Sequence, residues 1–155
     1  MKKFGYILLL LQALLFSCNG SKKTSTSARK PAPTRSVSFV KSDTLSEVLD
    51  EAKKKNKLVF VDFYTSWCTP CKMMDQDVFT NGQVKSFFDE NFISYKVNAE
   101  KGNGVNLATV FEIRAYPTLL FLNDKGQVVE KKEGALYPTG LLQFARRAID
   151  KHQGS

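Results

Sequence analysis

The chain has 155 residues, of which 43% are hydrophobic and 25% are charged, and its formal net charge is +8. Seven of its 23 basic residues lie in the first 35 positions, where no acidic residue occurs, so 16 basic residues face 15 acidic ones in the rest of the chain. This nearly neutral remainder argues against nucleic-acid binding, and the basic start suits attraction to a membrane surface instead.

The start of the chain has the pattern of an export signal. Residues 1–17 open with basic residues and continue as an apolar run that is too short for a membrane span, which predicts a signal peptide. The next residues, Leu15–Cys18, resemble a bacterial lipobox, so we expect a lipid on Cys18 that anchors the protein to a membrane. The alternative is an ordinary signal peptide that ends near a cysteine.

A tether and one domain follow this signal. Residues 18–35 are rich in Ser, Thr, Lys, Arg and Pro and have almost no apolar side chains. Such a segment cannot offset the entropy cost of ordering, so we expect a flexible tether. Residues 36–155 have the usual size of one domain with a single hydrophobic core.

The first part of the domain predicts a strand, a helix and a buried strand. Residues 37–40 alternate as a short strand does, and Thr44 with Glu47 forms the pattern of a capping box that opens a helix ending in lysines. The run Leu58–Tyr64 is nearly all apolar, which predicts a strand buried on both faces. It contains one out-of-place acid, Asp62.

The rest of the domain alternates between helical and strand patterns. An Asn-Gly break separates two helical stretches, and a turn-rich link suggests that the last two strands form an antiparallel hairpin. The full order β-α-β-α-β-α-β-β-α predicts an α/β fold with a central mixed sheet and helices on both faces. The predicted elements are helices at 72–79 and 84–91, a strand at 92–97, a helix at 107–111, strands at 117–122 and 127–133, and a helix from Pro138.

Two cysteines, Cys68 and Cys71, lie two residues apart between the buried strand and the next helix. This spacing lets them close a small disulfide across the first helical turn, and the N–H groups of the helix N-terminus stabilise a thiolate on Cys68. The layout is typical of a thiol–disulfide redox site. Export would place this pair in a compartment where disulfides form and persist. The chain has three cysteines, and because the lipid anchor would use Cys18, Cys68 and Cys71 are left as one pair.

Two other uses of a CxxC pair do not fit. A structural zinc site needs four ligands, and beyond the pair the mature domain offers only His152. Haem attachment needs a histidine directly after Cys71, where Lys72 stands. We therefore predict neither a metal nor another cofactor.

Several motifs together resemble the thioredoxin family. They are the acid six residues before the first cysteine, Trp67 and Lys72 on either side of the CxxC pair, and the distant sequence Tyr116-Pro117-Thr118. The resemblance covers nearly all of residues 36–155 and implies a thioredoxin fold. The two-part helix after the pair is more similar to membrane-linked members of the bacterial envelope than to cytosolic thioredoxin.

The resemblance also implies roles for the residues of the pair and the acid. Cys68 would be the exposed nucleophile that attacks a substrate disulfide, and Cys71 the thiol that resolves the mixed disulfide. Asp62 would be the buried acid that assists proton transfer at Cys71, with a pKa raised by its apolar strand. The alternative for Asp62 is an exposed acid at the end of the strand.

Further residues would bind the substrate. Pro117 matches the family's cis-proline, which brings the backbone of Tyr116 close to the thiols, where it can pair with an extended substrate. Trp67 and Pro70 would shape and stiffen the site. Lys96 aligns loosely with a lysine that lies near the buried acid in some members.

The resemblance implies a thiol–disulfide oxidoreductase in the periplasm of a Gram-negative bacterium, anchored to the membrane by its lipid. Its partners would be exported proteins that contain disulfides and a membrane thiol–disulfide electron donor. Pro70 and Asp62 favour a reductase, with an oxidase or isomerase as the alternative. A tethered peptide-binding or holdase-like module, whose thiols capture clients without turnover, is the alternative of a different class.

Overall fold

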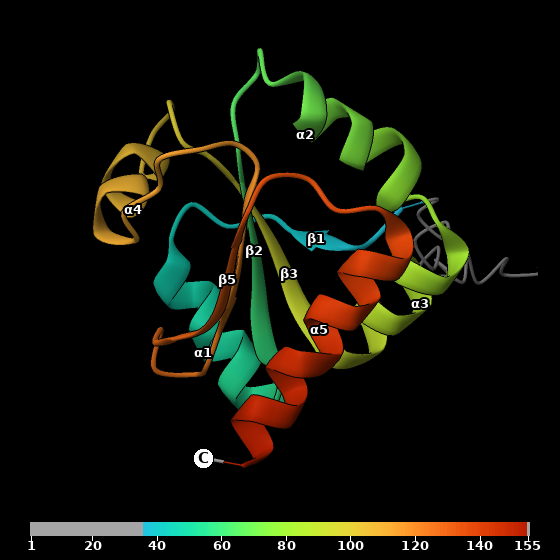
Figure 1. The fold of residues 1–155 in the computed structure, drawn as a ribbon. Helices are drawn as coiled ribbons and strands as arrows, with labels where there is room; N and C mark the ends of the chain where they lie inside the picture. Colours follow the sequence, from blue (N-terminus) through green and yellow to red (C-terminus); the bar gives the residue numbers. More distant parts are fainter. Residues whose placement is uncertain (1–35, 155) are drawn as a thin grey trace, which may run out of the picture. The chain divides into compact units, whose positions relative to one another are not determined.

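The computed structural model describes residues 36–154. The predicted signal peptide (1–17), the predicted lipidation site Cys18 and the predicted tether up to residue 35 lie outside the described residues. Within the described part, no helix is both long enough and apolar enough to cross a membrane. The elements, shown in Figure 1, are β1 (Phe39–Val40), α1 (Leu45–Lys55), β2 (Leu58–Tyr64), α2 (Thr69–Met73), η1 (Met74–Val78), α3 (Gly82–Asn91), β3 (Phe92–Asn98), α4 (Gly104–Val110), β4 (Thr118–Leu122), β5 (Val128–Glu133) and α5 (Pro138–Gln153).

The five strands form one mixed sheet in the order β1-β3-β2-β4-β5. Strand β3 runs parallel to β1 and β2, whereas β4 runs antiparallel to β2 and forms the predicted hairpin with β5. In this register Asp62 lies opposite Lys96 on one side and Leu119 on the other. The predicted α/β architecture with a central mixed sheet is confirmed.

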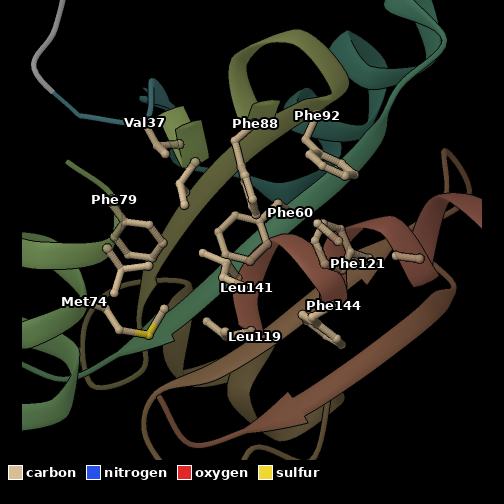
Figure 2. Close-up of a cluster of buried hydrophobic side chains, with 14 of the residues drawn as sticks. Val37, Phe60, Met74, Phe79, Phe88, Phe92, Leu119, Phe121, Leu141 and Phe144 are labelled. Atoms are coloured by element: carbon tan, nitrogen blue, oxygen red, sulfur yellow. The ribbon is translucent and has the colours of Figure 1, made fainter. Parts of the chain in front are cut away.

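One face of the sheet carries an aromatic core beneath η1, α3 and α5. Successive residues of a strand point to opposite faces, so Leu58 and Phe60 of β2 share this side. The Phe60 ring meets the Phe88 ring edge to face, with 4.9 Å between their centroids. Figure 2 shows this cluster, whose large fully buried members include Phe60, Met74, Phe79, Phe88, Leu119, Phe121, Leu141 and Phe144.

The other face of the sheet is covered by α1 and α4. Val59, Val61 and Phe63 of β2 point to this side, and Phe63 meets Phe111 at the end of α4 with 6.0 Å between ring centroids. Helices therefore cover both faces, as the order of elements predicted. The buried members on this side are Val48, Ala52, Val59, Val61, Phe63, Ile93, Tyr95, Val97, Ala99, Leu120 and Leu122.

The predicted helix at 72–79 is not a single α-helix. Helix α2 ends at Met73 and continues as the π-helical turn η1, in which the Phe79 N–H donates to the Met74 carbonyl oxygen at 2.8 Å. Met74, Val78 and Phe79 are all fully buried. A π-helical turn has more residues per turn than an α-helix, so it directs Val78 and Phe79 to the core together better than a regular α-helix would. Tertiary packing of Phe79 thus explains the difference.

The predicted capping box of α1 is half formed. The Thr44 hydroxyl accepts from the Glu47 N–H at 3.4 Å, as expected of an N-cap. The Glu47 carboxylate does not return to the Thr44 N–H, however, because Ser42 stands between them. The Ser42 hydroxyl donates to Glu47 at 2.6 Å and accepts from the Thr44 N–H at 3.1 Å.

Helix α4 begins at Gly104, three residues before the predicted start of a helix at residue 107. A Cβ atom at Gly104 would lie 2.0 Å from the Asn98 carbonyl oxygen, so only glycine allows the helix to start this close to the end of β3. Gly104 is therefore the first residue of the helix.

Candidate active site

The two cysteines form a disulfide at the start of α2, with their Cα atoms 5.3 Å apart. Cys68 is the N-cap residue of this helix, and its Sγ accepts a hydrogen bond from the Cys71 N–H at 3.1 Å. Pro70 lies in the first turn, where its missing N–H leaves no helical bond unmade. The helix N-terminus is thus directed at the Cys68 sulfur, where it stabilises a thiolate once the disulfide is reduced.

Cys68 is less accessible than the sequence led us to expect. It is 3% exposed and Cys71 is 1% exposed, so the prediction of an exposed nucleophile is wrong for this disulfide state. The Cys68 Sγ is bonded to the buried Cys71 and receives its N–H, which turns the sulfur inward. Thr69 and Pro70 between the two cysteines are exposed, and so is Trp67 beside them, with an exposed fraction of 64%.

Asp62 is a buried acid and not an exposed residue at the end of the strand. It is 1% exposed, and its Oδ1 has no hydrogen-bond partner among residues 36–154. Its Oδ2 lies 3.3 Å from the Nζ of Lys96. Burial raises the pKa of Asp62 from 3.8 to about 6; the Lys96 charge opposes this shift and the Asp75 carboxylate adds to it.

Lys96 lies between two carboxylates. Besides Asp62, its Nζ contacts Oδ1 of Asp75 in η1, and it stands over the Tyr64 ring, 4.6 Å from the centroid. Sequence reasoning placed Lys96 near the acid only by a loose alignment and missed Asp75 altogether. The signal that could have found Asp75 is its position four residues after Cys71, one turn along the helix.

Three side chains gather at the end of the sheet where the CxxC pair lies. The indole N–H of Trp67 donates to Oε1 of Glu100 at 2.9 Å, and its ring meets that of Tyr116 edge to face with 6.0 Å between centroids. The Tyr116–Pro117 peptide bond is cis, as the resemblance implied. Sequence reasoning missed Glu100, which reaches Trp67 from the loop after β3.

Pro117 comes to the same end of the sheet through strand pairing. Thr118, the first residue of β4, lies opposite Phe63 near the end of β2. In Figure 1 the loop after β2 and the start of α2 lie above this end of the sheet. The fold therefore gathers the predicted site residues Asp62, Cys68 and Pro117 from three separate stretches of the chain at one end of the sheet.

The described residues offer no cluster of three or more His, Cys, Asp or Glu side chains that could hold a metal ion. The chemistry available at this end of the sheet is that of two sulfurs, a helix N-terminus and a carboxyl group with a raised pKa. This combination suits thiol–disulfide exchange, because one thiol must ionise to attack and a proton must leave the other.

Comparison with known proteins supports the same chemistry. Residues 45–149 match the thioredoxin-like domain family. The chain belongs to this family. The fold and family that the sequence predicted are confirmed, and the family is one of disulfide oxidoreductases whose CxxC pair this chain retains as Cys68 and Cys71.

Three relatives are similar over most of the domain. A proposed disulphide isomerase from Bacteroides thetaiotaomicron, known from its solution structure, is 36% identical with a TM-score of 0.68, over 77% of this chain and 98% of that one. Thioredoxin H4 of Arabidopsis thaliana is 39% identical over 60% of this chain and 73% of its own. The thiol:disulfide interchange protein DsbD of Salmonella typhimurium is 32% identical over 66% of this chain and 18% of its own.

Other relatives are much longer proteins. The protein disulfide-isomerases of Zea mays and Datisca glomerata are 27% and 26% identical, and the chain spans only 20% and 27% of their lengths. This chain therefore matches only a part of each of them.

Proposed function

We propose that this chain is a thiol–disulfide oxidoreductase of the bacterial envelope that reduces disulfides in exported proteins. The observation that carries the proposal is the Cys68–Cys71 disulfide at the N-terminus of α2, on the strand-to-helix connection that follows the buried acid Asp62. The family membership and the relatives named as thioredoxins, disulfide isomerases and a thiol:disulfide interchange protein support it.

The reaction begins with the reduced pair. The Cys68 thiolate attacks one sulfur of the substrate disulfide, forms a mixed disulfide and releases the first substrate thiolate. Cys71 then loses its proton and attacks the Cys68 sulfur, which releases the second substrate thiolate and forms the disulfide seen in the structure. Two electrons pass from the dithiol to the substrate, whose two thiolates take up protons.

Asp62 is suited to take the proton from Cys71. A carboxyl group with a pKa of about 6 is ionised for the most part near neutral pH, yet it is a stronger base than an ordinary aspartate. Its Oδ1 has no partner within the described part of the chain, so one oxygen stays open to a proton.

Trp67 and Tyr116 are suited to contact the substrate. Both lie at the end of the sheet that carries the pair. The exposed Trp67 ring and the partly buried Tyr116 ring, which meet edge to face, offer an apolar edge to an extended peptide. Glu100 holds the indole of Trp67 in place through its hydrogen bond. Pro70, between the two cysteines, and Pro117, after its cis peptide bond, restrict the backbone of the site.

The proposed location is the periplasmic side of a Gram-negative membrane, to which a lipid on Cys18 anchors the domain. The signal-like residues 1–17 and the lipobox-like Leu15–Cys18 support it. In this setting a membrane thiol–disulfide donor would return two electrons to the Cys68–Cys71 disulfide after each turnover. The DsbD relative is named as a thiol:disulfide interchange protein, which fits such a relay.

The experiment that tests the function uses the full chain in detergent, with a disulfide-linked test peptide and a dithiol reductant. We expect repeated turnover, none in Cys68→Ser, and a trapped mixed disulfide in Cys71→Ser. Normal turnover in both variants would refute the mechanism. One equivalent of captured peptide without release would show a binding module instead.

The reduction potential of the Cys68–Cys71 pair then decides the direction. A value near that of thioredoxin, about −270 mV, would support a reductase, and a value near about −120 mV would make the protein an oxidant. An intermediate value together with reshuffling of mispaired disulfides would favour an isomerase, the activity named for the plant relatives.

A further inference from the structure

One lysine links the buried acid of the site to a second carboxylate. The Lys96 Nζ lies 3.3 Å from Asp62 Oδ2 and also contacts Asp75 Oδ1. The side chain of Asp62 is 1% exposed and that of Asp75 is 45% exposed. A single ammonium group therefore balances one carboxylate inside the protein and one at its surface.

Asp75 is the second residue of the π-helical turn η1. In η1 the Met74 side chain is buried in the core, and Asp75 follows it directly. Asp77 belongs to the same turn, carries the same charge and is exposed, but the ion pairs of Lys96 are with Asp62 and Asp75. The chain thus contains a matched acid that differs in its contact with the lysine.

Aromatic rings confine the ammonium group between the two acids. The Lys96 Nζ is 4.6 Å from the ring centroid of Tyr64 and 5.5 Å from those of Phe39 and Phe79. The faces of these rings attract the cation and leave it little room to swing into solvent. The side chain of Lys96 is only 20% exposed.

Two acids that share one cation are coupled. If Asp75 loses its charge, Lys96 is left to Asp62 alone and a nearby negative charge is gone, and both changes favour the ionised form of Asp62. The other groups that face Asp62 do not compensate, because β4 offers the apolar Leu119 at the paired position and the sulfurs of α2 are joined in the disulfide.

We propose that Asp75 is a positioning residue of the redox site, which shares the Lys96 ammonium group and so leaves the Asp62 carboxyl able to exchange a proton when Cys71 resolves the mixed disulfide. This inference rests on the proposed function for its last step. Asp75 acts through Lys96 and not on the reacting sulfurs. The raised pKa of Asp62, to which the Asp75 carboxylate adds, is consistent with it.

The first test is independent of activity. The titration of the Asp62 carboxyl is followed by carbon-13 NMR in the oxidised full chain, in detergent, for wild type, Asp75→Asn and Asp77→Asn. We expect the midpoint to fall by about one pH unit in Asp75→Asn and to stay unchanged in Asp77→Asn. Asp75→Glu, which can still reach Lys96, should return the midpoint towards the wild-type value.

The second test follows the resolving step. Reduced protein is mixed with a disulfide-linked test peptide, and decay of the mixed disulfide is measured in acid-quenched samples over a range of pH. In the wild type the rate should fall in acid with the titration of Asp62, and in Asp75→Asn this acid limb should move to lower pH together with the NMR midpoint.

The outcomes separate the two proposals. An Asp62 midpoint that does not move in Asp75→Asn, or that moves equally in Asp77→Asn, overturns the role of Asp75 even if the wild type reduces the peptide. A wild type that never turns over refutes the proposed function, and the NMR titration still decides whether Asp75 controls Asp62. A midpoint that moves while the acid limb stays in place overturns the link to Cys71.

Discussion

Replacement of Asp62 by asparagine should make the protein more stable at neutral pH. The pKa of Asp62 is raised from 3.8 to about 6 in the folded protein, so the fold holds this proton more tightly than the unfolded chain does. The stability that comes from this proton is complete below pH 3.8 and is lost as the pH rises through about 6.

The structure gives the size of the effect. The difference between a pKa of 3.8 in the unfolded chain and a pKa of about 6 in the folded protein corresponds to about 3 kcal/mol of unfolding free energy. About 2 kcal/mol of this is lost between pH 4 and pH 6. Solvent screening does not reduce this figure much, since the residue is 1% exposed. Asparagine has nearly the same shape as aspartate and does not titrate. The unfolding free energy of Asp62→Asn therefore lacks the pH-dependent contribution of this carboxyl group.

Urea unfolding of the oxidised proteins, followed by circular dichroism from about pH 4 to about pH 8, measures the difference. Other carboxyl groups titrate in both proteins, so we expect the unfolding free energy of Asp62→Asn to rise relative to wild type by about 2–3 kcal/mol over this range. Asp77→Asn serves as the control and should show no such trend. A difference between wild type and Asp62→Asn that is constant with pH would refute the reasoning.

Two further substitutions test the packing that supports the site. Gly104→Ala would place a Cβ atom 2.0 Å from the Asn98 carbonyl oxygen and should cost about 2–3 kcal/mol of stability, whereas Gly82→Ala, with open space around it, should stabilise by up to about 1 kcal/mol. Lys131→Met would remove hydrogen bonds of 3.0 and 2.9 Å to carbonyl groups at the end of α4 and should cost about 1–2 kcal/mol. Lys132→Met is the control for Lys131→Met, and urea unfolding measures the stability of all four variants. Equal changes in Gly104→Ala and Gly82→Ala, or in the two lysine variants, would contradict the packing described here.

The sequence predicted the parts of the site that depend on local pattern. An apolar run that contains Asp62, followed by Cys68 and Cys71, specifies a buried strand, an acid within it and a redox pair at a helix start, because each feature is written in consecutive residues. The structure agrees with the burial of Asp62 and with the disulfide. The order of elements predicted the mixed sheet, and the resemblance carried by these motifs and by Tyr116-Pro117-Thr118 implied the thioredoxin fold.

The parts that were missed depend on tertiary packing. The position of Asp75 four residues after Cys71 places it one helical turn from the pair, but its contact with Lys96 spans 21 positions of sequence and depends on the fold. Glu100 meets Trp67 across 33 positions of sequence, through a loop whose path only the fold defines. The burial of Cys68 was missed because a cysteine at a helix start gives no sign of how its sulfur turns.

The location of Asp62 in β2 indicates whether this acid serves function or stability. Leu58, Phe60 and Asp62 alternate along β2 onto the same face, so the acid stands where a third apolar residue would extend the aromatic core. Lys96 enters the same region from β3 and offsets only part of the cost of burying the charge, since the pKa of Asp62 is still raised. If the Asp62–Lys96 ion pair served to stabilise the fold, replacement of Asp62 would destabilise the protein. Here the replacement of Asp62 should instead raise the unfolding free energy at neutral pH and slow the resolving step by Cys71. A gain in stability together with a loss of rate is what we expect of a carboxyl group that serves proton transfer.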